Sequence, residues 1–308
     1  MKTEVSTIEL VSAKTNPLLG HVVWSPSKSA WYLGVSFTAL IAGPLTFSWQ
    51  NFVLFLVLSA VTLCLGHSLG IHRKLIHRSY ESPKWLEYLL VYLGSLVGMA
   101  GPFGMLRTHD LRDWAQRQKG CHDYFAHRQS FWRDAWWQLN CEIELENPPR
   151  FLLPEALAQD KFYRALERTW MLQQLPWMLL LGWMGGFGGV VWGVCVRVAV
   201  SLTGHWWVGH YAHRRGHRTY HVNEASVQGF NVRWCGLITF GECWHNNHHA
   251  YPGSAKLGLQ PDQLDPGWGV LRVLQTVGLV WNIKLPQDIP ARKELRKIEK
   301  GLIACSEF

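Results

Sequence analysis

The chain of 308 residues is 48% hydrophobic and 17% charged, which argues against two soluble domains and favours one membrane-embedded unit. Its net charge of +8 does not indicate a nucleic-acid partner, because Lys and Arg lie between and after apolar stretches rather than on one compact module. The seven cysteines are odd in number and lack Cys-x-x-Cys spacing, so we expect reduced thiols facing a cytosol and no disulfide framework.

The first half of the expected membrane part is a pair of apolar stretches, 30–47 and 51–71. They follow a polar segment, 1–29, that contains no apolar core of a cleavable signal. Each stretch approaches the ~20 residues that a bilayer core requires, and their connector is uncharged. The two stretches therefore predict a transmembrane helical hairpin.

A second apolar pair, 171–187 and 189–208, is joined by an uncharged, glycine-rich turn at 185–188 and predicts a second hairpin. Neither turn carries Lys or Arg. The basic residues gather instead in 72–84, 104–168, 214–233 and 284–300. By the positive-inside rule, both termini and every histidine-rich stretch are expected in the cytoplasm.

A fifth apolar stretch, 86–105, would be read as a span from hydropathy alone. If it crossed the membrane once, His122 would lie on the opposite side from His72 and His77, and the three could not share a site. We therefore expect an interfacial or re-entrant helix packed beside the spans. The alternative is a true span with unrelated histidines on the two sides.

The densest of the histidine clusters is His245, His248 and His249, in the run His-Asn-Asn-His-His. On a helix, positions i, i+3 and i+4 are neighbours on one face, so three imidazoles can converge on a metal centre. The cluster follows an apolar run and adjoins Trp244, which argues against a solvated polar loop.

Two further clusters lie at the predicted cytoplasmic ends of apolar helices, where ionisable groups are functional candidates. His72 and His77 are five residues apart, which does not place both on one face of an α-helix. Each would serve a different part of a site, or the helix must unwind there. In the later cluster, which comprises His205, His210, His213 and His217, only one or two need be ligands.

Many neutral imidazoles in one region suit iron, and a two-iron site needs many ligands together with open positions for oxygen. Soluble di-iron proteins use paired carboxylates from helices instead, and this sequence lacks that pairing. Zinc would need four ligands and would leave most of these histidines unexplained.

The runs IHRKLIHRSY (71–80) and GECWHNNHHAYP (241–252), with the order of apolar hairpins, resemble the membrane acyl-lipid and acyl-CoA desaturases over about residues 30–285. The resemblance implies an all-α integral membrane protein, with four transmembrane helices in two hairpins and a cytosolic helical cap that carries the histidine boxes. It also implies two irons, with ligands on His72, His77, His245, His248 and His249, and an extra ligand on His213 from the run WWVGHYAHRRG (206–216).

The second histidine box departs from the family pattern. With Trp114 registered on the Trp that precedes this box, Gln118, Cys121 and His122 fall on the three family ligands, so His122 alone survives. His109, His127 and the Cys121 thiolate are substitute candidates, and loss of one iron is the alternative.

The resemblance implies a single desaturase-like membrane domain, 1–308, made of a polar segment, 1–29, a desaturase-like core, 30–285, and a basic tail, 286–308. We expect the charges of the tail on a solvated helix face. We expect O2-dependent desaturation of a long acyl chain carried on CoA, carrier protein or glycerolipid. Because haem, flavin and iron–sulfur motifs are not evident, electrons must come from a separate ferredoxin or b-type cytochrome. A lipid or terpenoid hydroxylase or ketolase, and an inactive homologue, are the alternatives.

Overall fold

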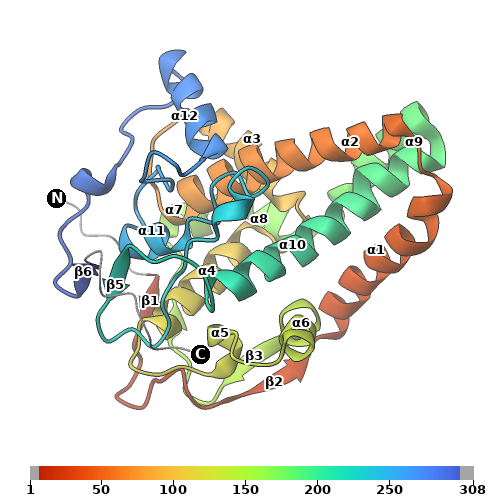
Figure 1. Ribbon diagram of the computed structural model, residues 1–308. Helices are drawn as coiled ribbons and strands as arrows, with labels where there is room; N and C mark the ends of the chain where they lie inside the picture. Colours follow the sequence, from red (N-terminus) through yellow and green to blue (C-terminus); the bar gives the residue numbers. More distant parts are fainter. Residues whose placement is uncertain (1–6, 299–308) are drawn as a thin grey trace.

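The computed structural model describes residues 7–298 and is mostly helical (Figure 1). Long helical segments lie side by side at one end of the molecule, and most of the short helices and the strands gather toward the other end. The α-helices are α1 (Pro26–Leu45), α2 (Trp49–Ala60), α3 (Lys84–Ser95), α4 (Pro102–Gln116), α5 (Asp123–Ala126), α6 (Phe131–Asn140), α7 (Glu155–Ala158), α8 (Lys161–Thr169), α9 (Gln174–Val190), α10 (Arg197–Ala212), α11 (His245–Ala250) and α12 (Pro266–Thr276). The π-helices are η1 (Val61–Ile76) and η2 (Val191–Val196), and the short 3-10 turns are η3 (Arg233–Cys235) and η4 (Pro286–Asp288).

Two helical stretches of the described chain are long and apolar enough to cross a membrane, and the second of them contains a sharp kink. The first, Trp49–Ile76, joins α2 to η1 and has a mean hydropathy of 2.2 over its most apolar window. The second, Gln174–Ala212, joins α9, η2 and α10, with a corresponding value of 1.7. Gly186 interrupts the second helix with φ +60°, a conformation that glycine adopts without steric cost. Beyond it η2 packs against α9, so the chain turns back where the sequence predicts the connection of the second hairpin.

The fifth apolar stretch forms two helices, α3 and α4, with a turn between them. At 12 residues, α3 is shorter than the ~20 residues that span a bilayer core. Its backbone lies directly on η1: a Cβ added to Gly70 would stand 2.3 Å from the Leu90 carbonyl oxygen, and one on Gly66 would stand 2.3 Å from the Gly94 nitrogen. Glycine at these positions therefore permits the close approach. The placement of this stretch relative to a membrane remains a prediction.

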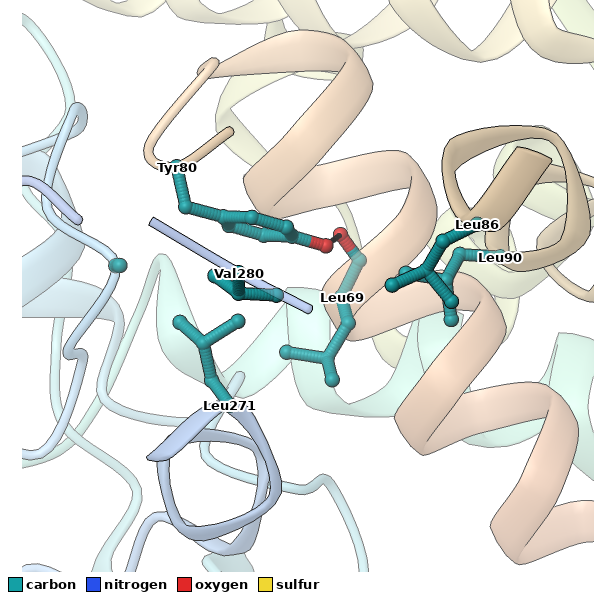
Figure 2. Packing of buried hydrophobic residues seen from close by; sticks show 7 residues of the cluster. Leu69, Tyr80, Leu86, Leu90, Leu271 and Val280 are labelled. Carbon is teal, nitrogen blue, oxygen red and sulfur yellow. Dashed lines mark hydrogen bonds between the residues drawn. The ribbon is translucent and has the colours of Figure 1, made fainter. Parts of the chain in front are cut away.

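A core of large apolar side chains fixes the end of η1 that carries His72. Leu69 packs with Leu86 and Leu90 of α3 on one side and with Leu271 of α12 on another (Figure 2). Tyr80 closes this cluster, and its hydroxyl donates a hydrogen bond to the Leu69 carbonyl at 3.0 Å. The helix that presents the histidines is thus held between two neighbouring elements.

Three short antiparallel strand pairs depart from the all-α expectation. The pairs are β1 (Ile8–Glu9) with β4 (Arg150–Phe151), β2 (Gly20–Trp24) with β3 (Cys141–Leu145), and β5 (Tyr220–Val222) with β6 (Leu295–Lys297). The expected helix in the basic tail is wrong at Leu295–Lys297, because these residues satisfy their backbone groups against β5. The remainder of that expectation, from residue 299 onward, lies outside the described residues.

Candidate metal centre

The π-helix η1 brings His72 and His77 together. Its hydrogen bonds run between residues five apart, and the His77 amide donates to the His72 carbonyl at 3.1 Å. The two Nε2 atoms are consequently 3.2 Å apart. Of the two alternatives that the spacing left open, the structure agrees with the second: η1 departs from α-helical winding, and its wider turn places positions i and i+5 side by side.

His72 and His77 belong to a first histidine group, which also contains His109 of α4 and His248 of α11. One nitrogen from each ring lies within 4.8 Å of the others. His248 is only 1% exposed, and neither of its ring nitrogens has a hydrogen-bond partner within the described part of the chain. An imidazole buried without partners is costly, so this geometry favours a ligand at the centre of the group.

A second histidine group consists of His213, His245 and His249. His245 Nε2 lies 2.9 Å from His213 Nε2 and 3.0 Å from His249 Nε2. The two groups adjoin, because the His245 and His248 rings stack with centroids 5.5 Å apart. The three histidines of α11 lie on one helix, as predicted, but they divide between two groups instead of converging on one.

The spacing and the charge state of these rings suit metal ions. Nitrogens bound about 2.1 Å from one ion in adjacent positions lie about 3.0–3.4 Å apart, which is close to the Nε2 separations in both groups. Burial holds the pKa of His249 at about 4, and it lowers the pKa of His213, His245 and His248 well below 6.5. The rings are thus neutral at pH 7, the form that binds a metal.

Acceptors behind the rings fix their orientation. Glu242 Oε2 lies 2.6 Å from His72 Nδ1, Asp110 Oδ1 lies 3.1 Å from His109 Nδ1, and the Gly209 carbonyl lies 2.8 Å from His213 Nδ1. The contacts of His109 and His213 are hydrogen bonds, and with Nδ1–H donated to these oxygens the two rings present an unprotonated Nε2 to their groups. The Glu242 carboxylate lies within ion-pair distance of His72. Such outer partners commonly orient and tune metal-binding histidines.

The two asparagines within the histidine run hold α11 in place. Asn246 donates to the Tyr220 and Gly229 carbonyls, at 2.8 and 2.9 Å. Asn247 donates to the Leu257 carbonyl at 2.7 Å. Because both side chains are buried, these bonds anchor the helix to β5 and to the loops that contain Gly229 and Leu257. The sequence reasoning missed these roles, as it missed Glu242, since their partners lie far away in the chain.

His127, a substitute candidate, lies beside the second group without joining it. Its Nδ1 donates to Asp134 Oδ2 at 2.9 Å, and His210 Nδ1 donates to the same oxygen at 2.7 Å. His127 Nε2 faces Arg112 Nη1 at 3.3 Å, so both of its nitrogens are engaged. His127, Asp134 and His210 are close enough together to hold a metal ion. Their hydrogen bonds instead fit a network in which neutral imidazoles donate to one carboxylate. His127 stacks on His213 at 5.2 Å and thereby supports the second group.

The structure does not bring His122 or Cys121 into either group. His122 precedes α5 and accepts a hydrogen bond from the Tyr124 amide, and Cys121 is buried in an apolar cluster with Ala115 and Phe125. Registration on Trp114 therefore points to the wrong part of the chain. Gln118, Cys121 and His122 have the spacing i, i+3 and i+4. If His109 is taken as position i instead, the other two positions are Arg112 and Asp113, which lie on α4 with His109 of the first group.

Comparisons with known proteins find similarity along most of the chain. The family model described as fatty acid desaturase matches residues 47–260. An sn-1 stearoyl-lipid 9-desaturase of Anabaena variabilis is 34% identical over 277 residues, which cover 89% of this chain and 97% of that protein. An acyl-CoA 5-desaturase of Anemone leveillei is 34% identical over 254 residues, which cover 82% of this chain and 78% of that protein.

Proposed function

The chain belongs to the fatty acid desaturase family, and on that premise we propose that it introduces a double bond into a long fatty acyl chain at a histidine-ligated di-iron centre. The observation that carries the proposal is the pair of adjoining, buried histidine groups whose Nε2 atoms converge. Zinc would account for one group of four histidines and leave the second group without a role.

The proposed ligands are His72, His77, His109 and His248 in the first group, and His213, His245 and His249 in the second. Bound iron would supply the activation of O2 and the removal of two hydrogens from adjacent methylene groups. The overall reaction consumes one O2, two electrons and two protons and releases two waters, so a reductant is required. A separate ferredoxin or b-type cytochrome is the proposed donor, and the net charge of +8 favours an acidic partner.

The chain's own residues position and shield this chemistry. Asp110 accepts a hydrogen bond from His109 so that Nε2 of this ring faces inward, and the Glu242 carboxylate lies within ion-pair distance of His72. The Glu242 carboxylate is itself held near Arg73, whose guanidinium pairs with Asp265 at 2.8 Å. Burial of His248 keeps bulk water away from the centre of the first group. These contacts pre-organise the ligands before metal binds.

We propose one desaturase-like domain, 1–308, whose core at 30–285 crosses the membrane as two hairpins and carries the histidine groups on the cytoplasmic side. The two long apolar helices and the family support a membrane location. Cysteines introduced at positions 48, 120 and 187 test it, because the native cysteines of the described chain are buried. Position 120 should react from the cytoplasmic side alone, and reaction there from the outer side would contradict the arrangement.

Relatives named as acyl-lipid and acyl-CoA desaturases support a fatty acyl substrate and favour desaturation over hydroxylation. The test is expression in a desaturase-deficient host, with lipid profiling and iron analysis of the purified protein. We expect new unsaturated chains and about two irons per chain. His248→Ala should abolish both, whereas His122→Ala, a histidine outside both groups, should preserve them. Hydroxylated lipids would favour the oxygen-inserting alternative, and the absence of iron from the wild type would contradict the proposal.

A further inference from the structure

Asp110, which accepts the hydrogen bond from His109, has a second partner far away in the chain. Its Oδ1 atom faces His109 Nδ1 at 3.1 Å, and its Oδ2 atom accepts a hydrogen bond from the hydroxyl of Thr7. Adjacent residues of an α-helix point about 100° apart, so Asp110 does not turn toward the ring of its neighbour by default. The Thr7 hydroxyl therefore bears on the orientation of a proposed metal ligand.

Strand pairing and burial place Thr7 beside α4 independently of this bond. The strand β1 begins one residue later and pairs with β4 through Ile8 and Phe151. The Thr7 carbonyl accepts a hydrogen bond from the Leu152 amide at 2.7 Å. Phe151 packs against the apolar cluster that contains Leu106 of α4, and β1 itself lies against this helix (Figure 1). Thr7 is 8% exposed, so its hydroxyl donates within the protein and not to bulk water.

The other carboxylate behind the first histidine group has a hydroxyl partner as well. Glu242, which lies 2.6 Å from His72 Nδ1, accepts a hydrogen bond from Ser68 Oγ at 2.5 Å. Ser68 is fully buried in η1. A hydroxyl thus stands behind each of the two carboxylates, but Thr7 comes from a segment that precedes the residues matched by the family model, 47–260.

We propose that Thr7 is a positioning residue of the first histidine group: its hydroxyl orients Asp110, which in turn fixes the ring of His109. This inference rests on the proposed di-iron function and adds the N-terminal strand pair to the elements that support the metal. With the hydroxyl present, each carboxylate oxygen of Asp110 has a donor. Without it, the Asp110 side chain, which is 20% exposed, can turn toward water, and the ring loses its fixed orientation.

The experiment uses the purified full chain and compares wild type with two variants. Thr7→Val keeps the shape of threonine and removes the hydroxyl, whereas Thr7→Ser keeps the hydroxyl. Thr15→Val is the matched control, because Thr15 lies in the same segment and its hydroxyl accepts an exposed hydrogen bond from the Ser12 amide. Iron affinity is measured by competition with a chelator, and Mössbauer spectra are recorded on protein loaded with 57Fe.

Loss of an outer partner of a metal-binding histidine costs about 10- to 100-fold in affinity, and Thr7 acts one bond further out, so we expect about a 3- to 10-fold loss in Thr7→Val. One of the two Mössbauer components should change, because His109 belongs to one group alone. Thr7→Ser and Thr15→Val should retain the affinity and the spectrum of wild type. Asp110→Ala should bind iron more weakly than Thr7→Val, and adding Thr7→Val to it should cause no further loss, since Thr7 acts through Asp110.

An affinity and a spectrum like those of wild type in Thr7→Val would overturn the inference. Equal losses in Thr7→Ser and Thr7→Val, or additive losses in the double variant, would overturn it too, because the hydroxyl or its action through Asp110 would then not be the cause. A lower midpoint of thermal unfolding with an unchanged spectrum would assign Thr7 a role in the fold alone and overturn it likewise. If Thr7→Val does not fold, Thr7→Ala is judged by the same outcomes. Wild type without two irons contradicts the proposed function itself, so the two failures are distinguishable.

Discussion

Replacement of Gly70 by alanine should separate η1 from α3. The new Cβ would lie 2.3 Å from the Leu90 carbonyl oxygen, 2.4 Å from the Leu90 carbonyl carbon and 2.9 Å from the Val91 nitrogen, all of which are backbone atoms. Relief of these contacts requires α3 to move by about 1 Å, since optimal non-bonded separations are about 3.5 Å. Overpacking of this kind costs about 1–3 kcal/mol, and we expect the upper part of that range because no flexible side chain can yield.

The assay is the midpoint of thermal unfolding in detergent, combined with iron per chain. A loss of about 3 kcal/mol corresponds to roughly a 100-fold change in the unfolding equilibrium. Iron retention should fall as well, because His72 lies two residues further along η1. Gly34→Ala is the control: no atom lies within 4 Å of its added Cβ, and alanine within α1 should gain about 1 kcal/mol. A Gly70→Ala protein as stable as wild type, or a Gly34→Ala protein equally destabilised, would refute the reasoning.

Two further predictions concern the ligands. Glu242→Gln should weaken iron binding by about 10- to 100-fold, because His72 loses its carboxylate partner. The control, Glu155→Gln on the surface of α7, should leave iron binding unchanged. Equal iron affinities of wild type and Glu242→Gln, measured by competition with a chelator, would contradict the role of Glu242. The metal-free protein should lose thermal stability as the pH falls from 6.5 toward 4. Burial holds the pKa of His249 at about 4 and lowers the pKa of His248. In this pH range the unfolded chain therefore binds protons that the folded chain does not, which favours unfolding. A midpoint of thermal unfolding that stays constant or increases as the pH is lowered from 7 to 5 would contradict the expected loss of stability.

The sequence allowed the histidine run 245–249 to be placed on a helix, because its spacing has a helical period. Its division between two groups was not predictable, since that depends on where His72 and His213 meet it in space. The placement of His72 beside His77 depended on how the helix winds, which a spacing of five residues does not decide. The prediction for the second histidine box depended on one aromatic residue, Trp114, which set the register on Gln118, Cys121 and His122. His109, on the same helix as Trp114, is the residue that lies in the first group.

Contacts between residues distant in sequence account for the rest. Glu242 lies next to His72, which is 170 positions earlier in the chain. Asn246 bonds to Tyr220 of β5, and Asn247 bonds to Leu257 in a loop beyond α11. A single sequence contains no periodicity that reports such pairs. The strand that replaces the expected helix in the basic tail likewise forms because β5 offers it backbone partners.

The π-helical geometry of η1 also limits how the length of this chain can vary. Inserting or deleting one residue rotates every later side chain around the axis, by about 100° in an α-helix and by somewhat less in the wider turn of a π-helix. Such a change between His72 and His77 would aim one imidazole away from its partner while leaving the apolar character of the segment intact. Insertions elsewhere, as in the link between α1 and α2 or in the turn before β4, would leave that pair aligned. Length changes should therefore accumulate in those connections and be absent from η1.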